Sequence, residues 1–208
     1  MVMFVDQSII VLSALFWFYI DTVKLFKNEK ILNSCIINSC FTAVYTNFAC
    51  LMYPQLIYDF PQIEPYLPSW IRTVLLITYG YGYRDLYFGI ENRKLDEIAH
   101  ATIYLVGCSF AYSNDYMSLL IVPFTLETSS FFLNLRPFKN IICDMTFVAT
   151  FAFYRFVILP VFCYHYLMNE NTLYKSYMAV VGGSITLLNM YWFHLISKKA
   201  IKVYNEKT

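Results

Sequence analysis

Long runs without charged side chains recur along the sequence, and their length limits what the chain can fold into. The clearest run extends from Ile31 to Tyr58 and contains no Asp, Glu, Lys or Arg. A helix needs about 20 mostly apolar residues to cross the ~30 Å hydrocarbon core of a bilayer. Because only 14% of the residues are charged, against about 25% in soluble domains, the sequence predicts a polytopic membrane protein.

Seven segments of this kind predict an all-α polytopic membrane protein with seven transmembrane helices. The predicted spans cover residues 7–26, 31–58, 69–90, 97–114, 116–135, 145–168 and 175–197. Helices are favoured over strands because the apolar runs are continuous and lack the alternating pattern of membrane barrels. Asp21 and Lys24 interrupt the first span, and Arg84 and Asp85 lie near the end of the third.

The basic residues predict the orientation, since Lys and Arg collect in short cytosolic loops. With seven spans, one side of the membrane receives only Arg72 and Lys175. The other side receives Lys24, Lys27, Lys30, Arg84, Arg93, Lys94, Arg136, Lys139, Lys198, Lys199, Lys202 and Lys207. This asymmetry predicts a lumenal or extracellular N-terminus and a cytosolic C-terminus.

Composition also excludes several classes of protein. A net charge of +1 and the lack of a basic stripe give no support for a nucleic-acid partner. The six cysteines form no C-x-x-C pair and fall mostly inside spans, so we expect small helix residues and no metal site. The last span, Ser176 to Ser197, contains no lysine, which excludes a retinal Schiff base there. No cofactor is predicted.

Polar side chains inside the predicted spans are the candidates for function. A central charge costs about 2.5–3.5 kcal/mol on insertion scales, and such residues usually face the interior of the bundle. The candidates are Arg84, Asp85, His100, Glu127, Asn134, Arg155 and Asn189. At ~1.5 Å per residue from the cytosolic helix ends, these groups fall in the cytosolic half and could form one polar layer.

Helical spacing groups some of these candidates. Glu127, Ser130 and Asn134 are spaced i, i+3, i+7 and share one face, and Asp96 and His100 are spaced i, i+4. Glu127 lies at a depth similar to that of Arg155, so an ion pair between them would lower the cost of both charges. Such a pair has two interpretations, a link between helices or part of a ligand site.

Five short segments occur in an order found in one family. Residues 126–138 read LETSSFFLNLRPF, similar to the pattern E-x-S-[ST]-x-F-x-N-x-R, and residues 80–86 read GYGYRDL, similar to G-Y-x-x-x-D-L. The remaining matches are His100, Arg155 with Pro160, and Leu188-Asn189-x-x-Trp192 leading into residues 196–203. Over residues 30–203 the chain resembles the TLC-domain (translocation-associated, longevity-assurance and ceroid-lipofuscinosis) family, most closely its TLC-domain-containing protein four subgroup.

The resemblance implies an architecture and a location. One peripheral N-terminal helix would precede a six-helix barrel that encloses a lipid-sized cavity, in the endoplasmic reticulum membrane. It divides the chain into an N-terminal transmembrane helix with a basic loop (1–30), a TLC domain (31–203) and a short cytosolic tail (204–208).

Two functional hypotheses follow from the resemblance. Ceramide synthases of the family acylate a sphingoid base from acyl-CoA and depend on two adjacent histidines, whereas residues 97–102 read EIAHAT, with His100 alone. The first hypothesis is therefore a non-catalytic protein of membrane lipid homeostasis. Its polar floor would contain Asp85, His100, Glu127, Asn134, Arg155 and Asn189, and the walls would be rich in aromatic residues. The expected lipid-binding residues are Glu127, Ser130, Asn134, Arg155, Asn189 and Trp192.

The second hypothesis is an acyltransferase with acyl-CoA as co-substrate. His100 would be the general base or the nucleophile, and Asp96 or Asp85 would fix its tautomer. In both cases the expected partner is a phospholipid, a sphingolipid or a fatty acyl chain.

Overall fold

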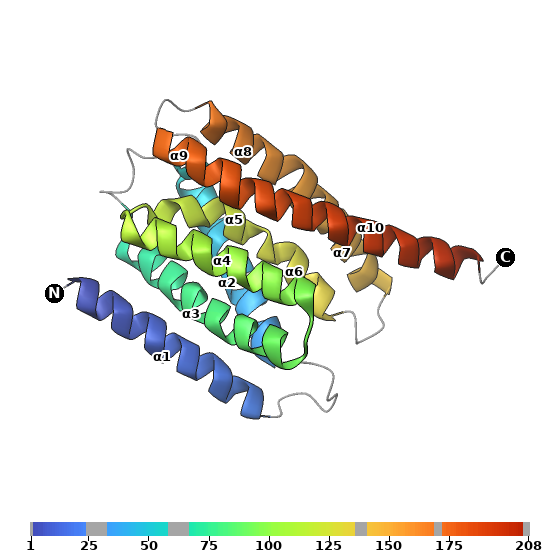
Figure 1. Cartoon of the computed structure of the whole chain (residues 1–208), viewed down its shortest axis with the longest axis horizontal. Helices are drawn as coiled ribbons and strands as arrows, with labels where there is room; N and C mark the ends of the chain where they lie inside the picture. Colours follow the sequence, from blue (N-terminus) through green and yellow to red (C-terminus); the bar gives the residue numbers. More distant parts are fainter. Residues whose placement is uncertain (1, 24–32, 58–66, 136–140, 169–171, 206–208) are drawn as a thin grey trace.

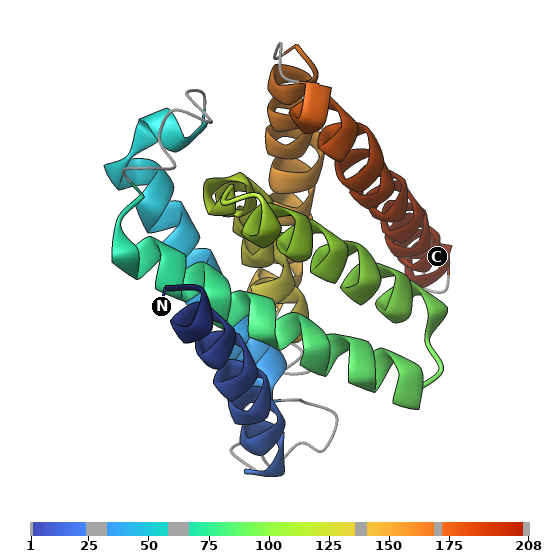
Figure 2. The ribbon, with the colours of Figure 1, turned by 60° about the vertical axis from the view of Figure 1, so that its left-hand side comes forward.

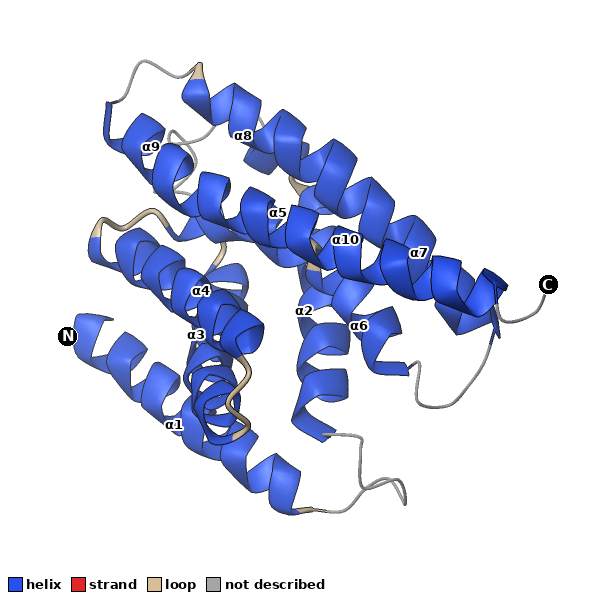
Figure 3. Ribbon diagram, turned by 45° about the vertical axis from the view of Figure 1, so that its right-hand side comes forward, coloured by secondary structure: helices blue, strands red, loops and turns tan. Residues whose placement is uncertain are grey.

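The computed structural model describes residues 2–23, 33–57, 67–135, 141–168 and 172–205, and this part of the chain contains helices and no strand (Figure 3). The predicted all-α class is confirmed. The elements are α1 (Val2–Thr22), α2 (Asn33–Met52), η1 (Pro54–Ile57), α3 (Ser69–Glu91), α4 (Leu95–Ser113), η3 (Met117–Leu120), α5 (Ile121–Thr125), α6 (Glu127–Leu135), α7 (Ile141–Phe153), η5 (Tyr154–Ile158), α8 (Leu159–Leu167), α9 (Thr172–Tyr177), η6 (Met178–Gly182) and α10 (Gly183–Asn205). Of the basic residues predicted to be cytosolic, Lys24, Lys27, Lys30, Arg136, Lys139 and Lys207 lie outside the described residues.

Several of these helices can span a membrane. By length and composition the candidates are Phe4–Thr22, Asn33–Met52, Ile141–Leu167 and Lys175–Lys198. The bent pair Met117–Thr125 and Glu127–Leu135 would be a fifth. The third and fourth predicted spans are helical as α3 and α4 but are not among these candidates, so a set of seven complete spans stays a prediction.

The predicted span at 116–135 is broken, which corrects the expectation of one continuous helix. Its two halves meet at an angle of 40°. Pro123 removes a backbone N–H from the middle of the segment. At the break, the Leu126 N–H donates to the Pro123 carbonyl at 3.1 Å in a tighter turn. The break places Glu127 at the first position of α6.

The contacts between neighbouring helices form a closed cycle. α2 packs on α3, α3 on α4, α4 on η6 and α10, η6 on α8, and the continuous α7–η5–α8 helix returns to α2 through α6. In Figures 1 and 2, α10 and the α7–α8 helix lie on the side of the molecule opposite α1. α1 lies at the edge, alongside α3. This order places the inner faces of α4, α6, α7 and α10 around a common space.

Small and polar residues attach α1 to α3. The Ser13 hydroxyl donates to the Ile77 carbonyl at 2.6 Å, and the Trp17 indole donates to the same oxygen at 3.3 Å. A Cβ built on Gly80 would lie 2.6 Å from the Ile10 carbonyl oxygen. Glycine is therefore required there for the two helices to approach this closely.

Large apolar side chains are exposed on the outward faces of the bundle. Leu12, Met145, Val161 and Leu187 each have more than half of their surface exposed. Soluble proteins rarely leave contiguous apolar patches open to water, whereas lipid tails are a suitable solvent for them. The exposure agrees with an integral membrane protein.

Candidate functional site

Two cavities meet inside the helix bundle. The larger, of about 420 Å³, lies between α2, α3, α4, α6, α7, η5 and α10. The smaller, of about 50 Å³, continues between α4, α5, α8, η6 and α10. Four side chains line both cavities, namely His100, Glu127, Arg155 and Trp192, and together they are called the collar below. Each comes from a different helical segment, so the collar depends on the tertiary fold.

The two cavities differ in chemistry. Beyond the collar, the walls of the smaller cavity are mostly apolar and include Phe124, Leu159, Phe162 and Val181. The larger cavity is lined on one side by charged residues of α3, of the α3–α4 loop and of the start of α4: Arg84, Asp85, Lys94 and Glu97. The Lys94 ammonium donates to Glu97 at 2.7 Å, and this hydrogen bond raises the pKa of Lys94. At neutral pH this lysine is charged and is paired with the Glu97 carboxylate in the wall of the larger cavity.

Arg155 is the most highly connected member of the collar. Its Nε donates to the Ser129 hydroxyl at 3.1 Å, one terminal nitrogen donates to the Ser130 hydroxyl at 3.4 Å, and the other donates to the Asn189 side-chain oxygen. The guanidinium carbon lies 5.3 Å from the centroid of the Trp192 ring. With 6% of its surface exposed, Arg155 connects its own helix to α6 and α10.

A π-helical turn presents Arg155 to these partners. Residues 154–158 form η5, and Pro160 follows at the start of α8. A proline inside a helix lacks the N–H group and collides with the carbonyl of the residue four positions earlier. A wider turn accommodates that carbonyl, and π-turns of this kind occur often at functional sites.

Glu127 and Arg155 line the same two cavities without a direct ion pair. Among the described residues, the ion pairs within 4.0 Å involve Arg72, Arg84 and Lys94, and none joins Glu127 to Arg155. The contact of Arg155 with α6 runs instead through hydroxyl groups, since Ser130, three residues after Glu127, accepts from Arg155 at 3.4 Å. The direct ion pair expected from equal depth is therefore not found among the described residues.

His100 lies where the two cavities meet. Its ring centroid is 5.3 Å from that of Trp192 and 6.3 Å from that of Tyr104. Asp96, expected one turn earlier on the same face, accepts a hydrogen bond from the Trp192 indole at 3.3 Å. Asp85 is paired with Arg84 at 2.9 Å. In the described part of the chain no hydrogen bond connects either carboxylate to His100.

Asn189 contributes an unusual group to the wall of the smaller cavity. The residue is 1% exposed and its side-chain oxygen accepts from Arg155. Its amide nitrogen is buried and has no hydrogen-bond partner among the described residues. A buried donor without an acceptor costs free energy, and such a group points to a function or a ligand.

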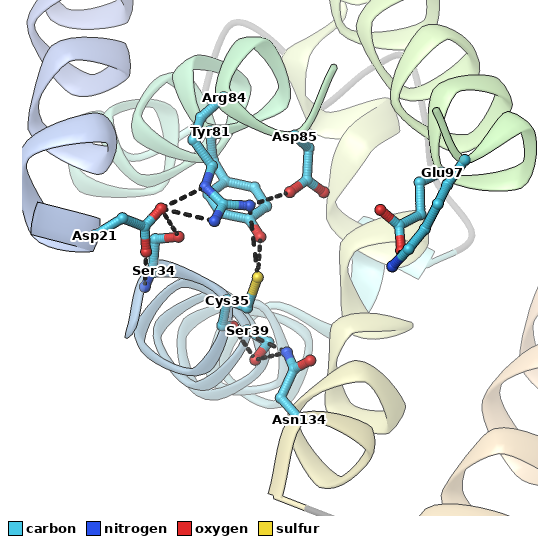
Figure 4. A network of polar contacts seen from close by, with 10 residues as sticks. Asp21, Ser34, Cys35, Ser39, Tyr81, Arg84, Asp85, Glu97 and Asn134 are labelled. Atoms are coloured by element: carbon cyan, nitrogen blue, oxygen red, sulfur yellow. Dashed lines mark hydrogen bonds and ion pairs between the residues drawn. The ribbon is translucent and has the colours of Figure 1, made fainter. Parts of the chain in front are cut away.

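A second polar cluster surrounds Arg84 at the boundary of the larger cavity. Figure 4 shows Arg84 between Asp21 and Asp85, at 2.6 Å and 2.9 Å respectively. Asp21 also accepts from the Ser34 backbone N–H at 3.0 Å and from its hydroxyl at 2.8 Å. Asp21 therefore satisfies a donor in the first turn of α2 while it neutralises Arg84. The cluster joins α1, α2 and α3.

Asn134 is used for helix packing as well as for lining the larger cavity. Its amide donates to the Cys35 carbonyl at 3.1 Å and to the Ser39 hydroxyl at 3.2 Å (Figure 4). These bonds attach α6 to α2.

Two partners of the buried arginines were not predicted from the sequence. They are Ser129, which accepts from Arg155, and Asp21, which was interpreted only as an interruption of the first span. One signal was present: Asp21 and Arg84 carry opposite charges and both lie near the predicted cytosolic helix ends. Depth alone cannot show that α1 and α3 are neighbours.

Comparison with known proteins gives one family. The family model described as the TLC domain matches residues 31–198. No curated protein and no solved structure gives a significant match.

Proposed function

The chain belongs to the TLC-domain family, and from that premise we propose that it binds a membrane lipid or fatty acyl chain in the joined cavities and acts in membrane lipid homeostasis. The observation that carries the proposal is the change across the collar from a cavity with charged residues on one side to a cavity with mostly apolar walls. A lipid has the same division between headgroup and tail.

The size of the larger cavity supports this function. Ligand pockets in proteins typically measure about 300–1,000 Å³, with a few polar groups that fix the orientation of the ligand. A cavity of about 420 Å³ falls within this range. The charged side would receive the headgroup, and the chain would pass between the collar residues into the smaller cavity.

The candidate lipid-binding residues would have different tasks. Glu127, Ser130, Arg155 and Asn189 would contact the polar part of the lipid, and Trp192 would offer its ring to the chain. Asn134 would act by fixing α6 on α2. We also propose placement in the endoplasmic reticulum with a lumenal N-terminus and a cytosolic C-terminus, and membership of the TLC-domain-containing protein four subgroup.

A second candidate function is acyl transfer from acyl-CoA, and the position of His100 at the junction favours it. An acyl chain in the smaller cavity would bring its thioester carbonyl to this imidazole, which could act as base or nucleophile. The partners of Asp96 and Asp85 weigh against this, because neither carboxylate is hydrogen-bonded to His100 in the described residues.

One preparation tests both candidates. The protein is purified, native mass spectrometry identifies any bound lipid, and the same sample is incubated with acyl-CoA and candidate acceptors beside His100→Ala. We expect a bound lipid and no turnover. Turnover that disappears in His100→Ala would replace the binding function by the enzyme. If no lipid copurifies and none binds on addition, the proposal fails.

A further inference from the structure

The collar has more hydrogen-bond donors than its neighbours use. A guanidinium group has five N–H donors, and Arg155 gives one bond each to Ser129, Ser130 and Asn189. Two of its N–H groups therefore have no acceptor among these side chains. The buried Asn189 amide nitrogen adds further donors without a partner in the described residues.

The neighbouring hydroxyl groups are already used by Arg155. The Ser129 hydroxyl accepts from Arg155 at 3.1 Å and donates to the Leu126 carbonyl at 2.8 Å, and the Ser130 hydroxyl accepts from Arg155 at 3.4 Å. Neither hydroxyl accepts from the Asn189 amide nitrogen, which has no partner among the described residues. An oxygen acceptor from a ligand in the cavity can meet this need.

The charge of Arg155 gives the same indication. In the described part of the chain, no carboxylate lies within 4.0 Å of its guanidinium group. A buried charge is costly unless it is paired or fully hydrogen-bonded. An oxygen with full or partial negative charge, placed against Arg155 and Asn189, would meet both needs.

We propose that Arg155 and Asn189 bind the carboxyl oxygen of a single-chain acyl lipid whose alkyl chain enters the smaller cavity. The inference rests on the proposed function and adds the chemical class of the ligand. The smaller cavity, about 50 Å³ and mostly apolar, has room only for the first carbons of one chain, since a single water molecule takes about 30 Å³ in the liquid. The carboxyl oxygen can come from a free fatty acid or from an ester.

The test uses Trp192 as a reporter in the full-length chain, with Trp17→Phe and Trp70→Phe removing the other two tryptophans. Brominated palmitate quenches Trp192 in nanodiscs, and palmitate, methyl palmitate and hexadecanol compete for the site. We expect palmitate or both carboxyl compounds to compete about tenfold better than hexadecanol, since a hydrogen bond to a charged group is worth about that factor. If palmitate alone competes well, the site recognises the carboxylate anion. If palmitate and methyl palmitate both compete well, the site recognises the carbonyl oxygen.

Asn189→Asp keeps an oxygen for Arg155 and removes the unpartnered amide donors, but it also adds a negative charge. Palmitate binding should therefore weaken through both changes, and binding of the uncharged methyl palmitate should weaken about tenfold through the lost donors alone. Asn114→Asp makes the same change at the exposed end of α4 and should leave binding unaltered. Glu127→Gln should strengthen palmitate binding, because it removes a like charge from the collar.

The inference is overturned if all three competitors bind equally or if Asn189→Asp binds palmitate as well as the parent protein. If no competitor and no brominated lipid reaches Trp192, the proposed lipid-binding function fails too. Arg155→Lys is the alternative variant if Asn189→Asp is poorly folded. It keeps the charge, loses the planar fork of donors and should also weaken palmitate binding.

Discussion

Arg84 is a buried cation whose charge is divided between two carboxylates of unequal exposure. Its side chain is packed 4.1 Å from the Phe88 ring and is only 1% exposed. Asp21 is buried with it, whereas the side chain of Asp85 is 26% exposed at the wall of the larger cavity. Two nitrogens of Arg84 donate to Asp21 and one donates to Asp85. The pair with Asp21 should therefore contribute more to stability.

Replacing each carboxylate separately tests this difference. Asp21→Asn removes the buried counter-charge of the Arg84 guanidinium group and should lower the free energy of unfolding by about 3 kcal/mol. Asp85→Asn leaves Asp21 in place and should cost about 1.5 kcal/mol. Asp115→Asn, at an 82% exposed side chain 3.4 Å from Arg72, should cost about 0–1 kcal/mol. Thermal unfolding of the purified variants gives the order, and equal losses for all three would contradict the argument.

Among the elements, the contact between α1 and α3 is closer than most helix pairs allow. A Cβ on Gly80 would lie 2.6 Å from the Ile10 carbonyl oxygen and 2.7 Å from the Ser13 Cβ. Neither atom is the far end of a flexible side chain, so the helices themselves would have to separate. Small residues are what allow membrane helices to pack at this distance.

Gly80→Ala should therefore destabilise the protein by about 1–3 kcal/mol, the usual cost of overpacking, and should weaken the bond from Ser13 to Ile77. Gly183→Ala is the matched control. Nothing lies within 4 Å of a Cβ at Gly183 in α10, and alanine favours the helix by up to about 1 kcal/mol. Unfolding measurements should show opposite signs for the two changes. A gain of similar size at both positions would mean that helix propensity, and not the α1–α3 contact, decides.

At the scale of the whole molecule, the position of the helices was predictable while their lateral contacts were not. Apolar runs located the helices, because hydrocarbon requires every backbone group to be bonded within the helix. The break before Glu127 was missed, although Pro123 was visible in the sequence, since a proline in a membrane helix can be tolerated. The contacts of Arg155 with Ser129 and Ser130 were missed because equal depth does not fix which side chains an arginine meets.

The predicted orientation of the bundle can be tested with two loops. Arg93 lies in the exposed α3–α4 connection, and Asn114 lies at the far end of α4. If basic residues face the cytosol, Arg93→Cys should react with an impermeant maleimide in sealed microsomes whose cytosolic face is outward. Asn114→Cys should react only after detergent is added, and the parent chain gives the background from its own cysteines. The reverse pattern would invert the topology.

Asp21 precedes the matched TLC domain, and this position affects whether the domain can insert into a membrane without α1. The family match begins at residue 31, yet Asp21 of α1 compensates Arg84 of α3, and Asp6 pairs with Arg72 at 2.8 Å. During synthesis α1 leaves the ribosome before α3, so both acidic partners are available when the arginines reach the translocon. A fragment that starts at residue 31 would insert Arg84 without its main counter-charge. Expression of the domain in isolation should thus yield a poorly inserted product that a separately supplied α1 segment rescues.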